Sequence, residues 1–229
     1  EDKRDMNWLM QKVTPDLPEI PIASEDVVAM LYTSGTTSKP KGVQVTHANY
    51  LYAGELMSKS IRLAPDDRQF IVLPLFHGNA QYYSTMSALT AGASIAITER
   101  FSASRYFKQA KRLGVTAGSL FAAPIRMILA QEYDPEDKNH SMRVIWFAQF
   151  VAEHQLAQFE EKYQVPLLQM YGMTETIGVP LMNPIDGIRK NTSIGKPTIG
   201  YEVRVVDETG NDLPIGEAGQ IIVKGIPGE

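Results

Sequence analysis

The sequence YTSGTTSKPKGV runs from Tyr32 to Val43 and directly follows the apolar, β-like run Val27 to Leu31. Five hydroxyl side chains lie within it, at Thr33, Ser34, Thr36, Thr37 and Ser38. Gly35 and Gly42 allow backbone N–H groups to approach an anion, and Lys41 adds a positive charge. The segment therefore predicts a phosphate-binding loop. The alternative is a polar surface turn between a strand and a helix, which fits many clusters of Gly, Ser and Thr.

The order of residues distinguishes this loop from a Walker loop. A Walker loop reads G-x-x-x-x-G-K-[ST], with the lysine directly after the second glycine. Here Lys41 precedes Gly42, and Gly35 lies seven residues before Gly42. Pro40 also restricts the backbone of the loop. We therefore expect a phosphate loop of another kind, with a strand before it and a helix after it.

The composition excludes several classes of function. The chain has 229 residues, of which 44% are apolar and 21% are charged, as is ordinary for a folded domain. With 22 basic and 26 acidic residues the net charge is −4, which gives no reason to expect nucleic acid or an anionic membrane as a partner. Cysteine is absent, so disulfides, thiolate nucleophiles and cysteine zinc sites are excluded, and we predict a cytoplasmic location.

Other sequence signals are also missing. No apolar run approaches the roughly 18 residues of a membrane-spanning helix, and the first residues, EDKRDMNW, do not have the form of a signal peptide. The four histidines form no H-x-x-x-H pair, so we do not expect a histidine metal site. Because the chain begins with Glu1 rather than Met, we expect it to be a piece of a longer polypeptide.

Apolar and amphipathic segments alternate along the middle of the chain. Residues 1–24 are polar and contain several prolines, which indicates an irregular lead-in with at most a short helix at 7–12. For residues 25–190 we predict strands at 27–33, 70–75, 94–98, 116–121, 144–148 and 167–170, and helices at 47–60, 80–90, 102–113, 124–131 and 152–163. This order predicts a layered α/β domain with a largely parallel sheet, whose ligands bind at the carboxyl ends of the strands. Short strands at 194–197, 202–206 and 220–224 predict a truncated, β-rich, barrel-like subdomain at 191–229.

A second motif, YGMTE, runs from Tyr171 to Glu175 and follows the predicted strand at 167–170. One interpretation is a strand end whose glutamate caps the next element. The other is a metal site, because magnesium takes one or two carboxylates together with phosphate oxygens and water. A phosphate loop elsewhere in the same chain favours the second interpretation.

Together the two motifs resemble those of the acyl-adenylate-forming enzymes, which include acyl-CoA synthetases, peptide-synthetase adenylation domains and firefly luciferase. The resemblance implies that the loop binds the β- and γ-phosphates of ATP, that Tyr171 lies against adenine, and that Thr174 contacts the α-phosphate. It further implies that Glu175 binds Mg²⁺, with Thr33 as a second contact, and that Lys41, Thr174 and Glu175 are catalytic. The nucleotide contacts that it implies are Thr33, Ser34, Gly35, Thr36, Thr37, Ser38, Lys41, Gly42, Tyr171, Gly172, Met173 and Thr174.

Several further segments bear on the resemblance. LPLFH, ending at His77, resembles the segment at the acid-binding pocket of the family, although a lone histidine after an apolar strand is more often a loop or core residue. SIGKP at 193–197 resembles an architectural turn in which Gly195 serves the turn. Residues 147–151 read FAQFV where the family usually has a glycine-rich segment beside adenine, so the adenine contacts of this chain are altered. FHGNAQ, TAGAS and VKGIPG, at residues 76–81, 90–94 and 223–228, look most like the crotonobetaine/carnitine-CoA ligase group.

The resemblance implies a ligase that joins a small carboxylic acid to coenzyme A. The carboxylate attacks the α-phosphate of ATP to give acyl-adenylate and pyrophosphate, and the thiol then displaces AMP. A C-terminal domain that carries the adenylation lysine would lie outside these residues, so we expect this fragment to be nearly inactive alone. The alternatives are a domain that passes its acyl group to a carrier protein, a luciferase-like oxidase, and a non-catalytic nucleotide-binding or scaffold module.

Overall fold

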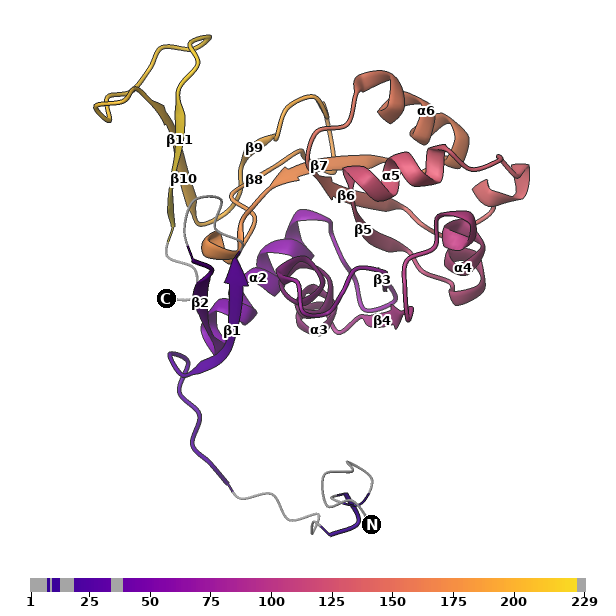
Figure 1. Ribbon diagram of the computed structural model, residues 1–229, viewed down its shortest axis with the longest axis horizontal. Coiled ribbons are helices and arrows are strands. Elements are labelled where there is room, and N and C mark those ends of the chain that lie inside the picture. The colour runs from indigo at the N-terminus through magenta and orange to yellow at the C-terminus, as the bar shows by residue number, and fades with distance from the viewer. Residues whose placement is uncertain (1–7, 9, 13–18, 34–38, 226–229) are drawn as a thin grey trace.

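We analysed a computed structural model that describes residues 8, 10–12, 19–33 and 39–225 (Figure 1). Its main element is a seven-stranded sheet with the strand order β4-β3-β5-β6-β7-β8-β9. The strands are β3 (Arg68–Ile71), β4 (Ser94–Ile97), β5 (Ala117–Phe121), β6 (Val144–Ala148), β7 (Leu167–Tyr171), β8 (Leu181–Met182) and β9 (Lys196–Pro197). Pairing is parallel from β4 to β7, and β8 and β9 add antiparallel strands at one edge. The predicted largely parallel α/β sheet is therefore confirmed.

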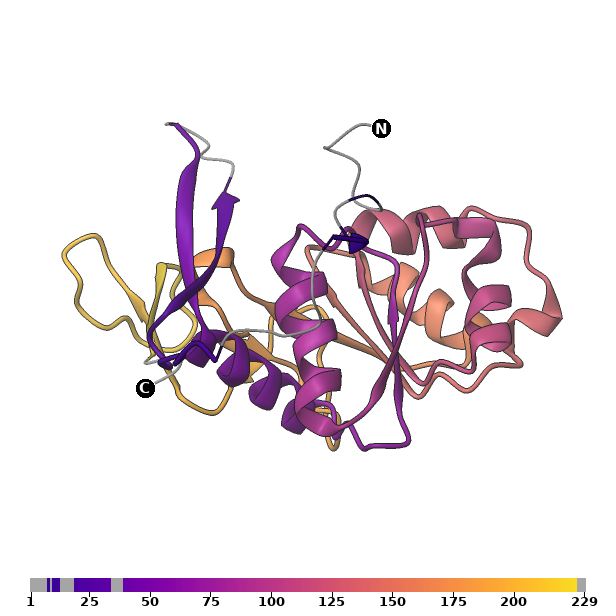
Figure 2. The ribbon, with the colours of Figure 1, turned by 90° about the horizontal axis from the view of Figure 1, so that it is seen from below.

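Helices cover both faces of this sheet (Figures 1 and 2). The α-helices are α2 (His47–Ser60), α3 (Met86–Ala91), α4 (Tyr106–Leu113), α5 (Ala122–Leu129) and α6 (Glu153–Tyr163), and a π-helix, η1 (Asn79–Thr85), precedes α3. One apolar core lies between the sheet and α4, α5 and α6, and a second lies between the sheet, α2 and η1. Strand β6 contributes Phe147 to the first core and Trp146 to the second, because successive side chains of a strand point to opposite faces. This explains why β6 reads as a continuous apolar run.

Helix α4 shows how an amphipathic segment is positioned. Tyr106, Phe107 and Ala110 are buried in the first core, as the sequence pattern predicts. On the other side, Lys108 and Lys111 form exposed ion pairs with Asp134 and Glu136. The predicted helix start at residue 102 differs from the structure, in which the 3₁₀ turn Ala103–Arg105 precedes α4.

The prediction that a helix directly follows the phosphate loop is wrong. Residues Lys41–Thr46 form a strand, β2, which pairs antiparallel with β1 (Val27–Thr33) in a two-stranded sheet of its own. Val43 and Val45 alternate with polar residues in this segment, which is the pattern of a half-buried strand. The loop is thus the connection of a β-hairpin, and Thr33 lies opposite Lys41 across it.

Helix α2 follows β2 and begins as predicted at its N-cap, Thr46. The Thr46 hydroxyl accepts a hydrogen bond from the Asn49 backbone N–H at 3.1 Å, and the Asn49 side chain accepts one from the Thr46 N–H at 3.0 Å. The predicted buried stripe is correct for Ala53, Gly54 and Met57, whereas Tyr50 is only half-buried and Leu56 is buried in its place.

Three other boundaries differ from the predictions. The strand expected at 70–75 is shorter, because β3 ends at Ile71. The helix expected at 80–90 begins as the π-helix η1. The strand expected at 194–197 is reduced to β9, which belongs to the main sheet, whereas β10 (Tyr201–Val206) and β11 (Gln220–Gly225) form a separate antiparallel pair. Both two-stranded sheets lie beyond the β9 edge of the main sheet (Figures 1 and 2), and the domain boundary near residue 191 remains a prediction.

Candidate active site

A cavity of about 710 Å³ lies at the carboxyl ends of the parallel strands. Its described walls come from the ends of β5, β6 and β7, from the turn after β3, from η1, and from the β1–β2 hairpin. Carboxyl ends of neighbouring parallel strands meet at one edge of a sheet, where α/β folds bind their ligands. The sequence motifs at residues 32–43, 73–77 and 171–175 are therefore brought together, as expected from their positions after strands.

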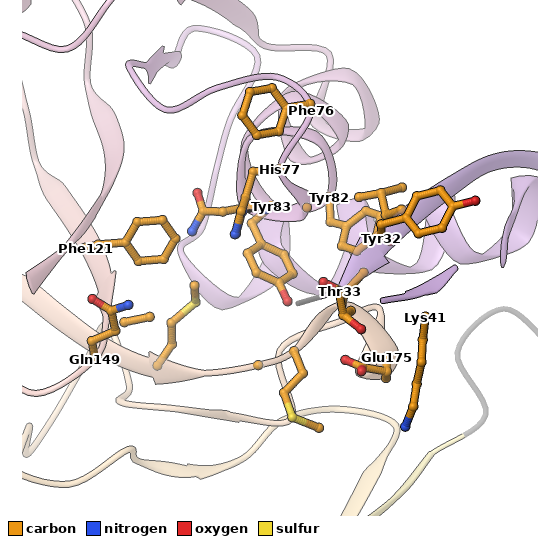
Figure 3. A pocket seen from close by; sticks show the side chains of 18 residues that line it. Tyr32, Thr33, Lys41, Phe76, His77, Tyr82, Tyr83, Phe121, Gln149 and Glu175 are labelled. Carbon is orange, nitrogen blue, oxygen red and sulfur yellow. Dashed lines mark hydrogen bonds between the residues drawn. The ribbon is translucent and has the colours of Figure 1, made fainter. Parts of the chain in front are cut away.

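One end of the cavity carries the charged side chains (Figure 3). Thr33, Lys41, Thr174 and Glu175 all line the cavity, and the hairpin pairing sets Thr33 opposite Lys41. A cation, hydroxyls and a carboxylate are suited to bind a phosphate chain together with a hard metal ion. The predicted phosphate contacts of Ser34, Gly35, Thr36, Thr37 and Ser38 lie outside the described residues and stay predictions. Gly42 is paired with Tyr32 in the hairpin.

Glu175 is held by a short and strained segment. It lies in the 3₁₀ turn Thr174–Thr176, which is closed by hydrogen bonds between Thr176 and Met173. The next residue, Ile177, has φ 60° and ψ −68°, and the Gly178 N–H donates to the Thr176 carbonyl at 2.6 Å. A β-branched residue in this γ-turn conformation is unfavourable, and such strain tends to persist at functional sites.

The side chains at this end of the cavity are suited to magnesium bound together with a nucleotide. They are less suited to a metal ion bound by protein ligands alone. Among the described residues no group of three or more His, Asp or Glu side chains could hold a metal ion. Glu175 and Thr33 supply one carboxylate and one hydroxyl at the same end of the cavity. Mg²⁺ commonly takes one or two carboxylates and completes its shell with phosphate oxygens and water, so these residues suffice when a nucleotide is bound.

Successive side chains at the end of strand β7 lie on two different sides of the strand. Met170 and Gly172 line the cavity, whereas Tyr171 does not, because alternate side chains of a strand point to opposite sides. Gly172 is required here, since a Cβ atom at this position would lie 2.7 Å from the Tyr83 hydroxyl oxygen. The contact of Tyr171 with adenine stays a prediction.

The opposite end of the cavity is aromatic and amide-rich. His77 lies against Phe121, with ring centroids 5.4 Å apart, and Gln149 lies beyond Phe121 (Figure 3). The Asn79 backbone N–H donates to His77 Nδ1 at 3.1 Å, so a neutral ring carries its proton on Nε2 and can donate it. Desolvation lowers the pKa of His77, which favours that neutral form.

Several lining residues were not found from the sequence. Tyr82 and Tyr83 come from η1, and Asn79 is its first residue. The Tyr82 hydroxyl is buried and has no hydrogen-bond partner within the described part of the chain. Burial raises the pKa of Tyr82, and nearby Tyr50 and Glu175 raise it further. The only signal in the sequence for this part of the cavity was that residues 147–151, which include Gln149, depart from the glycine-rich segment that is usual in the family.

The SIGKP segment at residues 193–197 has the predicted architectural role. Gly195 has φ 97°, and a Cβ atom there would lie 2.1 Å from the Met182 carbonyl carbon. Only glycine fits this turn, which brings β9 against β8.

Comparison with known proteins identifies the family of this chain. The model of the family described as "AMP-binding enzyme" matches residues 1–227. The chain belongs to this AMP-binding enzyme family. A crotonobetaine/carnitine–CoA ligase from Citrobacter koseri is 37% identical over 210 residues, which cover 91% of this chain and 40% of that relative. The chain therefore spans about 40% of the length of such curated relatives of the AMP-binding family.

Solved structures of family members have the same fold. A benzoate CoA ligase from Burkholderia xenovorans superimposes with a TM-score of 0.86 at 26% identity, covering 97% of this chain and 45% of that one. O-succinylbenzoate coenzyme A synthetase from Bacillus subtilis, solved with ATP and a magnesium ion, gives 0.80 at 28% identity, covering 95% and 45%. Within the described residues of this AMP-binding chain, no helix is long and apolar enough to cross a membrane.

Proposed function

We propose that the full-length polypeptide containing this chain is an ATP-dependent acid–CoA ligase. The carboxylate of a small acid attacks the α-phosphate of ATP, forming acyl-adenylate and releasing pyrophosphate. The thiol of coenzyme A then attacks the acyl carbon and releases AMP. The observation that carries the proposal is that Thr33, Lys41 and Glu175 lie together at one end of a cavity that also has an uncharged, aromatic end.

In this proposal the side chains act by positioning and by stabilising charge. Lys41 and the hydroxyls of the hairpin loop bind the departing pyrophosphate, and Thr174 binds the α-phosphate. Glu175, with Thr33, would hold Mg²⁺, which supplies charge stabilisation to the phosphate oxygens when bound. No nucleophilic side chain is needed, since two substrates react directly once they are aligned, and this suits a chain without cysteine.

Coenzyme A is the favoured acceptor. Relatives of this chain are named CoA ligases, and so are two of the solved structures that are similar to it. A carrier protein as acceptor, and a nucleotide-binding module without catalysis, are the competing functions. Neither nucleic acid nor a membrane is a proposed partner, and a cytoplasmic location remains a prediction from the absence of cysteine.

The direct test is a screen of carboxylic acids for acid-dependent release of AMP by the full-length polypeptide with ATP, Mg²⁺ and either coenzyme A or a phosphopantetheine-loaded carrier protein. We expect AMP release that requires both an acid and coenzyme A. Release only with the carrier protein would replace the acceptor in the proposal. If ATP with Mg²⁺ bound but no acid gave pyrophosphate or AMP, the non-catalytic function would be favoured instead.

A further inference from the structure

The Tyr201 side chain reaches the turn that carries Glu175 from another part of the fold. Tyr201 is the first residue of β10, in the two-stranded sheet beyond the β9 edge of the main sheet (Figure 1). Only 7% of the residue is exposed, and its ring packs in the second core. The Tyr201 hydroxyl donates a hydrogen bond to the Thr176 carbonyl at 2.6 Å and accepts one from the Gly178 N–H at 3.0 Å. One side chain thus joins the backbone on both sides of Ile177.

Ile177 has a backbone conformation that needs such support. Its φ of 60° and ψ of −68° belong to the rare, strained form of the γ-turn, which is unfavourable for a β-branched residue. A conformation of this kind persists only where the surrounding structure holds it. The Ile177 side chain is buried in the second core, and the Tyr201 hydroxyl ties together the peptide groups on either side of it. Without that hydroxyl, we expect the turn to open to ordinary backbone conformations more often.

Two glycines make room for this arrangement. A Cβ atom at Gly178 would lie 2.6 Å from the Tyr201 hydroxyl oxygen. Gly200, directly before Tyr201, has φ 85°, and a Cβ atom there would lie 2.3 Å from the hydroxyl oxygen of Tyr52 in α2. The Tyr52 hydroxyl donates to the Ile199 carbonyl at 2.9 Å, and the Tyr52 ring packs edge-on against the Tyr201 ring, with centroids 5.9 Å apart. The backbone on both sides is therefore shaped around tyrosine hydroxyls.

The position of the Glu175 carboxylate depends on this turn. Glu175 is exposed, and among the described residues no hydrogen bond or ion pair holds its carboxylate. It directly precedes Thr176, whose carbonyl accepts the hydrogen bond from Tyr201. Because the carboxylate has no partner of its own, the backbone of the turn determines where it lies. A shift of the turn would therefore move it relative to Thr33 and Lys41, which line the same end of the cavity.

We propose that Tyr201 is a positioning residue, whose hydroxyl holds the Glu175 carboxylate in place for the Mg²⁺ ion of bound ATP. Mg²⁺ demands near-ideal octahedral geometry, so a displaced ligand binds it less well. A turn that is already fixed needs no further ordering when the nucleotide binds. The alternative is that Tyr201 only anchors β10 to the core, which predicts a loss of stability and no effect on Mg²⁺. The inference rests on the proposed function through the assignment of Mg²⁺ to Glu175.

The test is titration calorimetry of ATP binding, with and without Mg²⁺, on the full-length polypeptide and its Tyr201→Phe variant at a temperature where both are folded. The substitution keeps the ring in the core and removes only the hydroxyl. The affinity for ATP with Mg²⁺ should fall roughly three- to tenfold, the range that one uncharged hydrogen bond supplies, because the turn is formed in fewer molecules. The affinity without Mg²⁺ should hardly change. In the pyrophosphate-release assay, KM for ATP with Mg²⁺ should rise while KM for the acid stays the same.

Tyr163 offers a matched control. Its hydroxyl also donates to a backbone carbonyl, that of Ile128 at 3.3 Å, but Tyr163 lies in the first core and is not among the described residues that line the cavity around Glu175. Tyr163→Phe should lower the thermal midpoint and leave the effect of Mg²⁺ on ATP affinity unchanged. Hydrogen exchange reports on the turn without any ligand. The Gly178 N–H should exchange faster in Tyr201→Phe than in wild type, and at the wild-type rate in Tyr163→Phe.

A double-mutant cycle separates positioning from a general loss of stability. If Tyr201 acts through Glu175, Tyr201→Phe should not lower the affinity for ATP with Mg²⁺ any further when Glu175→Gln is already present. Independent contributions of the two residues would instead add, as they do for sites that share no partner.

The outcomes separate this inference from the proposed function. If Tyr201→Phe retains the full effect of Mg²⁺ on ATP affinity, or if the two substitutions add, Tyr201 is only an anchor and the inference is wrong, while the ligase function stands. A wild type whose ATP affinity does not depend on Mg²⁺ would overturn both. If Tyr201→Phe behaves as expected but no acid supports pyrophosphate release, the ligase function fails and the positioning role of Tyr201 stands.

Discussion

The parallel strands of the main sheet begin at one edge, the amino edge, and end at the opposite edge, the carboxyl edge. The polar groups at these two edges differ in their hydrogen bonding. At the amino edge, Asp67, Thr116 and Arg143 directly precede β3, β5 and β6, and their side chains form one connected network. Asp67 accepts hydrogen bonds from the Thr116 hydroxyl at 2.6 Å and from Arg143 at 3.0 and 2.6 Å. Arg143 also donates to two backbone carbonyls at the end of α2, those of Ile61 and Arg62.

At the carboxyl edge, polar groups stay unpaired. Asn79 and the Tyr82 hydroxyl are buried without partners among the described residues. Positive φ occurs at both edges, at Gln149 and Ile177 here and at Arg62 beside the Asp67 network. The same strands thus support a satisfied network at one end and an unsatisfied cavity at the other. We infer that the amino edge contributes stability and that the carboxyl edge is adapted to ligands, because unpaired buried groups persist where they serve binding or catalysis.

The largest expected effect lies at the carboxyl edge. Glu175→Gln in the full-length polypeptide should lower acid-dependent pyrophosphate release by roughly 100- to 1,000-fold, because one charged contact to the reacting phosphates is lost. The thermal midpoint without ligand should hardly change, since Glu175 is exposed. Glu161→Gln, at an exposed position of α6, serves as the matched control. Equal activity of Glu175→Gln and Glu161→Gln would remove Glu175 from the site.

The next effect lies at the amino edge. Asp67→Asn should lower the free energy of unfolding by about 3 kcal/mol, because it leaves Arg143 and Thr116 without their shared partner in a largely buried setting. Asp186→Asn breaks the exposed Arg62–Asp186 pair and should cost less than about 1 kcal/mol. Urea denaturation of both variants measures the difference. A similar cost for the two would mean that the network does not stabilise the sheet.

Tyr201 and Tyr82 lie near Glu175 and differ in whether their hydroxyl groups are hydrogen-bonded. The Tyr201 hydroxyl donates to the Thr176 carbonyl at 2.6 Å and accepts from the Gly178 N–H at 3.0 Å, so Tyr201→Phe should cost about 2 kcal/mol of stability. The Tyr82 hydroxyl has no described partner, so Tyr82→Phe should leave stability unchanged or raise it by up to about 1 kcal/mol. A comparable loss of stability in both variants, measured by thermal unfolding, would contradict the prediction that the Tyr82 hydroxyl does not stabilise the ligand-free protein.

The last expected effect is a pH dependence from Asp67. Burial by itself would raise the pKa of Asp67, but hydrogen bonds from Arg143, Thr116 and the Ala64 N–H outweigh it and lower the pKa. The stability from this lowered pKa is present above the unfolded-state value of about 4 and is lost as pH falls through the folded-state value. Urea denaturation from neutral to acidic pH should show wild type and Asp67→Asn converging as the pH falls below about 4. A gap that widened on acidification would show that the sign is wrong.

The sheet and helices were predictable where a local pattern decides them. The buried runs at Val144–Ala148 and Leu167–Tyr171, and the apolar face of α4, depend on residue types alone. The hairpin strand β2 was missed because the five residues before the N-cap Thr46 look like part of the loop. The length of β3 was overestimated, since apolar residues 72–75 continue the pattern after the strand has left the sheet.

The cavity was predictable only in part. Its charged end follows from the motifs at residues 32–43 and 171–175, which are continuous in the sequence. Its uncharged end depends on tertiary structure, because nothing local distinguishes a satisfied asparagine from Asn79. That Met170 faces the cavity and Tyr171 does not could be seen only once the strand was placed against the cavity. The strain at Gln149 is likewise visible only in the backbone.

The most direct test of the contrast between the edges is the affinity for ATP with and without Mg²⁺, measured by titration calorimetry on the full-length polypeptide and its Glu175→Gln and Asp67→Asn variants. We predict that Glu175→Gln loses the part of the affinity that depends on Mg²⁺. Asp67→Asn should retain it at temperatures where it is folded. Retention of the full Mg²⁺ dependence by Glu175→Gln, or its loss in folded Asp67→Asn, would contradict the assignment of ligand binding to the carboxyl edge.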